Sequence, residues 1–371
     1  MIHPDCFQRP WLAEQGAALR VQPNNLHLLE RCIHALELVG RLSDAGLDFV
    51  FKGGTSLVLL LNPIRRLSID VDIATPEPIE RIKAILEQVA LNRPPFLRYE
   101  HQEKRDRDAP PTRHFKIYFR SVAGVQAESY ILLDVMTTAH SYPVTERRSI
   151  AAAFIRLEAD SQVLLPTVDC ILGDKLAAFA PRTIGVLFDP LDRNGNPRDR
   201  DPLQIIKQLF DVGHLFAESS NLEHAAATYR ATFEAQNRYR GGHFTVESCL
   251  DDTIEAAKAL CLTPSDQNAA HTPHQTIMRA GQRGLGSHLL TEPFTLDRHA
   301  RVAASRAALL ATLIRHERMT HIPRDIVRSV PASTEFQFIR LTGENAVLDP
   351  ILRRTSPEAL YLWYLIDEAE V

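Results

Sequence analysis

The segment Phe49–Ile73 constrains the fold more than any other part of this chain of 371 residues. Residues 48–51 end in three apolar positions and are typical of a short strand, and Gly53-Gly54 follow almost directly. The apolar run 56–61 then predicts a helix. Residues 68–74 alternate between apolar and polar side chains, which predicts a second strand with one polar face. The order strand, glycine pair, helix, strand indicates a compact α+β unit.

The glycine pair predicts a site for phosphate groups. Gly53 and Gly54 join the end of a strand to the start of a helix, where backbone amides point outward at the positive end of the helix dipole. We expect Thr55 to cap this helix and to bind a phosphate oxygen. The alternative interpretation is an ordinary turn.

Three aspartates predict a site for divalent metal. Asp70 and Asp72 are two residues apart on the predicted strand, so both carboxylates lie on the same face. Such a pair suits Mg²⁺, which takes oxygen ligands and lets substrate phosphates complete its octahedron. Asp134 interrupts an otherwise apolar strand, where an isolated charge is costly unless it is paired or bound to metal. The alternative for each is a solvated charge.

The remaining pattern divides the chain into an α+β domain, residues 1–165, and a helical domain, residues 166–371. In the first domain we predict helices at 26–47 and 77–91, a β-hairpin formed by residues 113–122 and 129–138, and a further strand at 154–157. In the second we predict an exposed loop at 187–202, irregular structure at 262–294, and helices at 168–180, 202–217, 222–235, 246–260, 298–316 and 356–369.

Composition excludes several classes of protein. With 24% charged and 45% hydrophobic residues, the chain is neither disordered nor collagen-like. The net charge of −4 argues against a protein that coats nucleic acid by bulk charge. We expect neither a membrane span nor a signal peptide, since we find no apolar run of sufficient length and no basic segment followed by an apolar one at the start. Its five scattered cysteines predict a reduced, cytoplasmic protein without a disulfide framework or a zinc site.

The motifs carry a resemblance to a known family. Residues 51–57 read FKGGTSL and residues 66–72 read RLSIDVD. This pattern resembles the AbiEii/AbiGii (MenT-like) nucleotidyltransferase toxin family, which belongs to the polymerase-β-like nucleotidyltransferase superfamily. The resemblance covers about residues 26–215 and continues with Asp134, with Lys175, Ala178 and Arg182 in a K-x-x-A-x-x-x-R pattern, and with Lys207 and Asp211 in a last helix; Gln208 stands where the family pattern has Asp.

The resemblance implies roles for these residues. Asp70, Asp72 and Asp134 would bind Mg²⁺ or Mn²⁺, and Asp134 would position or deprotonate an acceptor hydroxyl. Lys175 would contact the triphosphate, since its ammonium is a compact counter-charge, and Asp211 would orient it. The implied nucleotide-binding set is Gly53, Gly54, Thr55, Ser56, Arg66, Ser68, Lys175, Arg182 and Lys207. The implied fold is a polymerase-β-like domain, a small mixed sheet with helices, followed by a mostly helical domain that completes the nucleotide site and holds the acceptor.

The expected function is that of a Mg²⁺-dependent nucleotidyltransferase toxin. It would transfer NMP from an NTP substrate to RNA, most simply the tRNA 3′ end, and so block translation. The resemblance also implies a cognate antitoxin, and we expect a monomer with no membrane contact. Two alternatives stay open: a nucleotidyltransferase that acts on a protein or small-molecule hydroxyl, and an inactive module that binds a nucleotide or a partner.

Arginines in the helical half suggest a place for the acceptor. Seven lie at positions 298, 301, 306, 315, 318, 324 and 328, and Arg238, Tyr239 and Arg240 add charge and an aromatic ring. Such a cluster predicts a surface for an RNA backbone. The alternative is a set of arginines on solvated helix faces.

Overall fold

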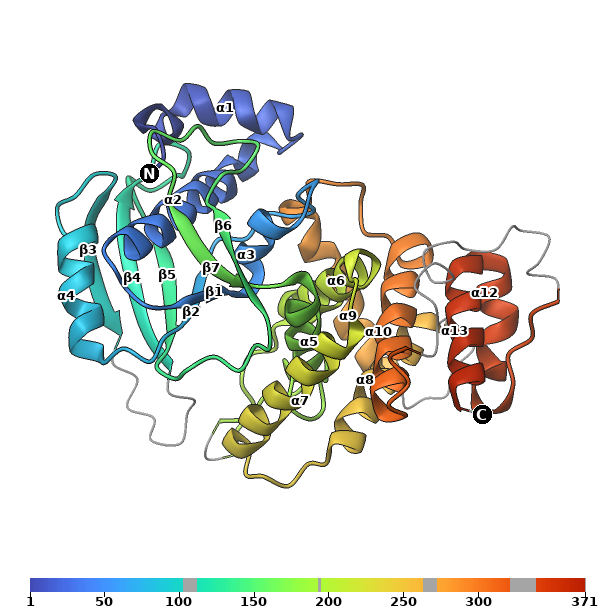
Figure 1. The fold of residues 1–371 in the computed structure, drawn as a ribbon. Coiled ribbons are helices and arrows are strands. Elements are labelled where there is room, and N and C mark those ends of the chain that lie inside the picture. Colours follow the sequence, from blue (N-terminus) through green and yellow to red (C-terminus); the bar gives the residue numbers. More distant parts are fainter. Residues whose placement is uncertain (103–111, 193–194, 263–271, 321–337, 371) are drawn as a thin grey trace. The chain divides into compact units, whose positions relative to one another are not determined.

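The chain folds into two compact units, seen in a computed structural model that describes residues 1–102, 112–192, 195–262, 272–320 and 338–370 (Figure 1). The first unit comprises Met1–Thr167 with Ser287–Glu292, and the second comprises Val168–Gly286 with Pro293–Val371. The sequence placed 287–292 in the helical domain. The structure corrects this, because the backbone N–H of Leu67 donates to the His288 carbonyl at 2.8 Å.

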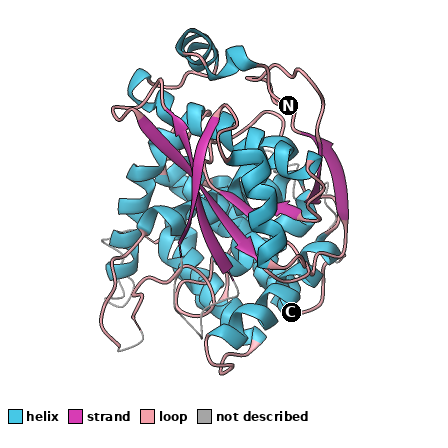
Figure 2. Cartoon of the chain, turned by 90° about the vertical axis from the view of Figure 1, so that its left-hand side faces the viewer, coloured by secondary structure: helices cyan, strands magenta, loops and turns pink. Residues whose placement is uncertain are grey.

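A five-stranded mixed sheet organises the first unit (Figure 2). The strand order is β1-β2-β5-β4-β3; β2 and β5 are parallel, and the other pairs are antiparallel. β6 and β7 form a separate antiparallel ribbon. The strands are β1 (Val50–Lys52), β2 (Val71–Ala74), β3 (Phe96–Gln102), β4 (Thr112–Arg120), β5 (Glu128–Met136), β6 (Thr145–Ser149) and β7 (Gln162–Pro166).

The sheet has one buried and one partly exposed face, as its alternating sequence requires. On β5, Ile131, Leu133 and Val135 are fully buried, whereas Asp134 between them is partly exposed. The buried face joins a core that includes apolar residues of the long helix α2 and of α4. The helices of this unit are α1 (Arg9–Ala18), α2 (Leu26–Asp44), α3 (Gly53–Leu60) and α4 (Ile79–Ala90), with short 3₁₀ turns η1 (Pro4–Phe7) and η2 (Pro23–Asn25).

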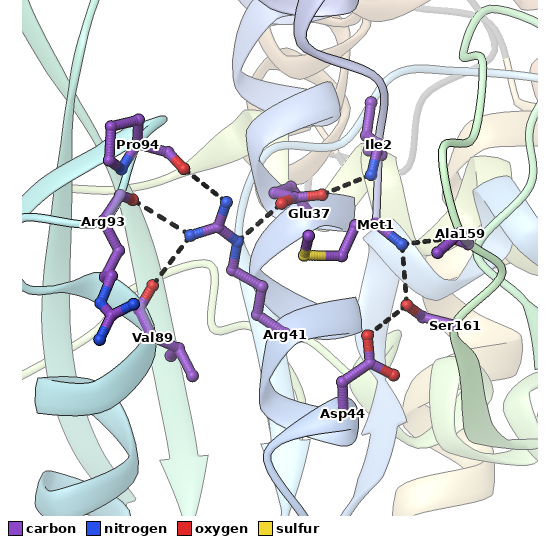
Figure 3. Close-up of polar contacts among 10 residues, drawn as sticks. All are labelled: Met1, Ile2, Glu37, Arg41, Asp44, Val89, Arg93, Pro94, Ala159 and Ser161. Atoms are coloured by element: carbon purple, nitrogen blue, oxygen red, sulfur yellow. Dashed lines mark hydrogen bonds and ion pairs between the residues drawn. The ribbon is translucent and has the colours of Figure 1, made fainter.

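Helix α2 also buries charged groups, each with partners. Glu37 is 1% exposed and accepts hydrogen bonds from the Ile2 N–H at 2.7 Å and from Arg41 Nε at 2.6 Å (Figure 3). Arg41 in turn donates to backbone carbonyls, including that of Val89 in α4. The Met1 amino group donates to Ser161 Oγ at 3.0 Å, and Ser161 donates to Asp44 at the end of α2. These bonds tie the first residues of the chain to α2 and to the segment before β7.

The second unit is helical and has its own core. Its helices are α5 (Val168–Ala178), α6 (Pro202–Glu218), α7 (Leu222–Tyr239), α8 (Val246–Cys261), α9 (Thr272–Leu285), α10 (Arg301–Arg315), α12 (Asp349–Thr355) and α13 (Pro357–Glu370), with shorter turns η4 (Gly286–His288, which spans the division between the units), η5 (Leu296–Ala300) and η7 (Gly343–Leu348). Trp363 is fully buried and donates to Cys261 Sγ at 3.4 Å. In the parts of the chain that the structure describes, no helix has the length and apolar character to cross a membrane.

Most sequence predictions of structure are confirmed, and the structure differs from them at several places. The hairpin and the six predicted C-terminal helices are present. The predicted strand at 154–157 is wrong, since Leu157 makes only an isolated bridge to Ile2. The strand predicted at 68–74 begins at Val71. Strands β3, β6 and β7 were not predicted. Helix α9 lies in a segment that was expected to be irregular.

Candidate active site

The glycine pair lies where β1 turns directly into α3. Lys52 ends β1, Gly53 has a φ of +78°, and α3 begins at once. A positive φ of this size disfavours a side chain, so glycine is the natural residue there. The chain therefore turns from strand to helix without a connecting loop, and the first amides of α3 lie beside the polar face of the sheet.

Both glycines also make room for functional side chains. A Cβ on Gly53 would come within 2.1 Å of Asp72 Oδ2, and a Cβ on Gly54 would come within 2.6 Å of Arg66 Nη2 and 2.8 Å of Ser68 Oγ. No real Cβ tolerates such distances. The pair therefore brings Asp72, Arg66 and Ser68 against the backbone at the start of α3, which agrees with their proximity in the sequence motif.

Asp72 belongs to a row of polar residues that crosses the whole sheet. Lys52 on β1 pairs with Asp72 on β2, Asp72 with Asp134 on β5, Asp134 with His114 on β4, and His114 with Gln102 on β3. Residues directly opposite in neighbouring strands share a face and lie within about 4.5–5.5 Å at their Cβ atoms. We call these five residues the catalytic row, after the catalytic roles that the sequence analysis predicts for Asp72 and Asp134. The structure thus places the second and third predicted carboxylates side by side.

Asp134 is held by a histidine that the sequence analysis did not single out. His114 Nδ1 lies 2.6 Å from Asp134 Oδ1, with both side chains partly exposed. An ionised carboxylate only accepts, so Nδ1 carries the proton of this bond. The two residues lie on the two strands of the predicted hairpin, β4 and β5. The sequence analysis could have found His114 only by fixing the register of that hairpin, which pairs it with Asp134.

Asp70 lies just before β2, and 41% of its side chain is accessible, against 26% for Asp134. Arg31 of α2 approaches it, with Nη2 3.8 Å from Asp70 Oδ1. Burial lowers the pKa of Arg31, and the Asp70 charge opposes that shift. The guanidinium therefore provides a fixed positive charge beside the first aspartate of the motif.

Two hydroxyls of α3 donate to backbone carbonyls. Thr55 is fully buried and donates to the Asp70 carbonyl, and Ser56, also buried, donates to the Gly53 carbonyl at 2.8 Å. The predicted cap at Thr55 is therefore wrong: the N-cap position is Lys52, which makes no side-chain cap. The Thr55 bond instead fixes α3 to the residue that begins the DxD motif.

Arg66 is 6% exposed and lies against Gly54, with Nη1 donating to the Leu67 carbonyl at 3.3 Å. Its backbone also bridges to Leu289. Arg66 is therefore buried next to the glycine pair, and its guanidinium points to the start of α3.

The donor set of the row suits a hard divalent cation. Asp72 and Asp134 are adjacent carboxylates, with Asp70 nearby in sequence. Within the described residues, no group of three or more His, Cys, Asp or Glu side chains already converges on one point. A metal held here would therefore draw part of its coordination from phosphate oxygens and water, as Mg²⁺ commonly does.

The predicted residues of the second unit form their own cluster. Lys175 on α5 lies 3.2 Å from Asp211 Oδ2 on α6 and donates to Gln208 Oε1 at 3.0 Å. The three side chains are buried. Gln208, which departs from the family pattern, thus supplies a neutral acceptor to Lys175 in place of a second carboxylate. A buried ammonium needs such partners.

Arg182 and Lys207 are the two other predicted residues of this unit. The Arg182 backbone N–H donates to Asp252 Oδ2 at 2.7 Å, and the residue itself is exposed. Lys207 is half-buried on α6, next to Gln208 in sequence.

The arginines predicted to form an RNA surface are engaged within the second unit. Arg301 is 1% exposed and donates to Asp297 and Thr355. Further acceptors are Glu358 for Arg306, Asp251 for Arg315 and the Ala369 carbonyl for Arg318. Arg240 donates to the carbonyls of Ile184 and Gly185, and burial lowers its pKa. Arg324 and Arg328 lie outside the described residues. These bonds hold helices and loops of the second unit together, and the RNA surface stays a prediction.

Comparison with known proteins gives a family. The profile described as "Nucleotidyl transferase AbiEii toxin, Type IV TA system" matches residues 37–332, which include the glycine pair, the DxD motif and the Lys175 cluster. No curated protein matches the sequence. Among solved structures, the nucleotidyltransferase toxin MenT4 of Mycobacterium tuberculosis H37Rv is similar at 14% identity and a TM-score of 0.44, covering 81% of this chain and 98% of that chain. By the extent of the profile match, the chain belongs to the AbiEii nucleotidyltransferase toxin family of type IV toxin–antitoxin systems.

Proposed function

We propose that this nucleotidyltransferase moves a nucleoside monophosphate from an NTP to a hydroxyl at the 3′ end of an RNA, with tRNA as the principal acceptor and arrest of translation as the result. The observation that carries the proposal is the catalytic row. In this row Asp72 lies beside Asp134 on one face of the sheet. Asp72 is also next to the start of α3, where Gly53 and Gly54 let other groups come close to the backbone. Carboxylates and helix amides together are a receptor for a metal-bound triphosphate.

In this reaction the acceptor oxygen forms a bond to the α-phosphorus, and the bond from that phosphorus to the pyrophosphate oxygen breaks. Asp70, Asp72 and Asp134 would hold Mg²⁺ or Mn²⁺, which supplies charge stabilisation for the transferred phosphoryl group. Asp134 accepts the proton of the acceptor hydroxyl. His114 keeps the Asp134 carboxylate oriented through its 2.6 Å bond.

We assign the phosphates of the NTP to the start of α3, and we propose for Lys175 the triphosphate contact that the family resemblance implies. The ammonium of Lys175 is a compact counter-charge, and Asp211 and Gln208 fix its position. Arg182 and Lys207 add positive charge on the same unit. Gly53, Gly54 and Ser68 border the place where the phosphates would bind. We further propose a monomer in the cytoplasm that is silenced by a cognate antitoxin.

A labelling assay tests this function. The purified protein is incubated with Mg²⁺, total tRNA and each α-labelled NTP in turn, with Asp70→Ala as the control. Label on RNA that the variant fails to transfer supports the proposal and identifies the base. Label on protein supports the second candidate acceptor, a protein hydroxyl. Absence of label with nucleotide binding retained contradicts tRNA as the acceptor.

A further inference from the structure

The polar face of the sheet carries two neighbouring tyrosines beyond the catalytic row. Tyr118 on β4 pairs directly with Tyr130 on β5, and their ring centres lie 5.7 Å apart. Each is four residues from a member of the row on its own strand, His114 and Asp134, so all four side chains share one face. Tyr130 is 36% exposed. Tyr130 therefore offers part of an aromatic ring to solvent on the same face of the sheet as Asp134.

Cationic groups surround these rings. Arg98 Cζ lies 3.5 Å from the centre of the Tyr118 ring, and Lys116 Nζ lies 4.6 Å from the centre of the Tyr130 ring. Arg31, which also approaches Asp70, lies 5.5 Å from the Tyr130 ring. We call Tyr118, Tyr130, Arg31, Arg98 and Lys116 the tyrosine platform.

The charges of the platform are unevenly balanced. Arg98 pairs with Glu100 at 2.6 Å and with Glu128 at 3.0 Å, so its charge is compensated. Among the described contacts, Arg31 has one carboxylate, Asp70, at 3.8 Å, and Lys116 lies opposite Glu100 of β3, whose carboxylate already accepts from Arg98 and Tyr118. Both cations lie within 5.5 Å of the Tyr130 ring, the more exposed ring, which shares β5 with Asp134.

We propose that the tyrosine platform binds the unpaired 3′ segment of the acceptor RNA, with bases stacked on Tyr130 and Tyr118 and with phosphates near Lys116 and Arg31. The inference rests on the proposed function and names how its acceptor is held. Proteins bind single strands by stacking bases on aromatic side chains and by tracking the backbone with cations, often on an open sheet face. Four residues along β5 span about 14 Å, a distance that a few unpaired nucleotides cover. The 3′ hydroxyl then faces Asp134.

Direct RNA binding tests the platform without reference to transfer. The probe is a short single-stranded RNA with 2-aminopurine near its 3′ end, titrated with the full chain and followed by anisotropy and by quenching of the 2-aminopurine. We expect Tyr130→Leu to weaken binding by about tenfold and to abolish the quenching, because one stacked base is lost. Tyr130→Phe keeps the ring and should bind within about twofold of the wild type.

Two further variants separate the platform from other surfaces. Lys116→Gln should lower the slope of log affinity against log salt by ~0.7, the share of one phosphate contact on a single strand. Tyr239→Leu, at the end of α7, tests the rival RNA surface predicted in the second unit, and on the platform proposal it should leave binding unchanged. A loss at Tyr239→Leu with none at Tyr130→Leu would overturn the proposal.

The remaining outcomes are also decisive. Equal RNA binding by Tyr130→Leu and wild type, or no RNA binding by the wild type, would contradict the platform. A weakened affinity of Tyr130→Leu for an α,β-methylene NTP, with RNA binding intact, would assign the ring to the nucleotide base instead. If the platform variants lose RNA binding while the wild type transfers no label to that RNA, the platform stands and the proposed function fails.

Discussion

The two units use their charged residues in different ways. In the first unit, a single row of polar side chains crosses one face of the sheet, and Asp70, Asp72 and Asp134 remain partly exposed there. In the second unit, charged groups face inward: Lys175 and Asp211 pair in the core, and Arg301 is 1% exposed. The comparison teaches that a cluster of arginines in a sequence does not by itself mark a surface for nucleic acid. Position relative to the core decides whether a charge serves chemistry or structure.

The largest effect should come from the catalytic row. Asp72→Ala removes a carboxylate that lies against Gly53, and we expect nucleotidyl transfer to fall by about 1,000-fold, because metal-assisted charge stabilisation is worth several kcal/mol. The rate of label transfer measures this, and the unfolding temperature serves as the control. Transfer within about tenfold of the wild type would break the assignment of this face to the chemistry.

Next comes the buried network of α2. Glu37→Ala removes the carboxylate that accepts from Arg41 Nε and from the Ile2 N–H. We therefore expect the free energy of unfolding to fall by about 3–5 kcal/mol. Urea unfolding followed by circular dichroism of the full chain measures the change. Glu37→Gln keeps an acceptor without the charge and should fall between the two. If Glu37→Ala proves as stable as the wild type, the view of this network as structural is contradicted.

Acid should weaken the first unit through His34. Burial lowers the pKa of His34 from 6.5 to about 3, and its ring stacks on Phe119 while Nδ1 donates to the Glu30 carbonyl. In the unfolded chain the imidazole of His34 binds a proton near pH 6.5, whereas in the folded chain it stays neutral down to about pH 3. This contribution to stability is therefore complete above pH 6.5 and falls by up to roughly 4 kcal/mol towards pH 3.

Unfolding titrations at several pH values check this, with His34→Gln as the matched variant. Glutamine can donate to the same carbonyl but does not titrate in this range. The difference between wild type and His34→Gln in the loss of unfolding free energy with acid measures the contribution of the imidazole. Equal pH profiles would show that the pKa of His34 is not lowered by burial.

The smallest effect should come from the arginines of the second unit. Arg306 and Glu358 form a partly exposed pair at 2.7 Å. Arg306→Ala should lower stability by about 0.2–1 kcal/mol for the pair, and somewhat more where the bond to the Gly213 carbonyl is also lost. RNA affinity should stay unchanged. If Arg306→Ala lowers RNA affinity and leaves stability unchanged, the arginines of the second unit serve RNA binding, as the sequence predicted. The contrast between the two units would then fail.

Much of the site follows from local sequence. Gly53-Gly54 and the DxD pair lie within one strand–helix–strand segment, so their geometry depends on local turns and on alternation along a strand. The β4–β5 hairpin, which carries His114 and Asp134, is also a local structure. The strand of Asp134 was expected beside the DxD strand; what the sequence did not show was that β2 and β5 pair in parallel, in the register that brings Asp72 next to Asp134.

The missed elements have identifiable causes. Strand β3 reads FLRYEHQ, with charged and polar residues at an edge of the sheet, so it lacks an apolar strand pattern. Helix α9 contains Gly281 and Gly284, which predict irregular structure. The structure explains the first: a Cβ on Gly281 would come within 2.0 Å of the Pro202 carbonyl oxygen, so glycine permits close packing of α9 on α6.

Buried polar residues were the hardest to foresee. His34 and Glu37 look like the solvated side of an amphipathic helix, yet each finds partners contributed by distant segments or by the helix backbone. The same holds for Gln208, which looked like a departure from a motif until its bond to Lys175 was seen. Tertiary contacts of this kind override local pattern.

The most direct test of the central claim is transfer to an RNA whose 3′ end is either intact or oxidised by periodate, with the preferred α-labelled NTP and Mg²⁺. The catalytic row predicts label on the intact RNA, none on the oxidised RNA, and none on either with Asp72→Ala. Label on oxidised RNA or on protein, or label that persists with Asp72→Ala, would contradict a transfer to the 3′ hydroxyl carried out by this face of the sheet.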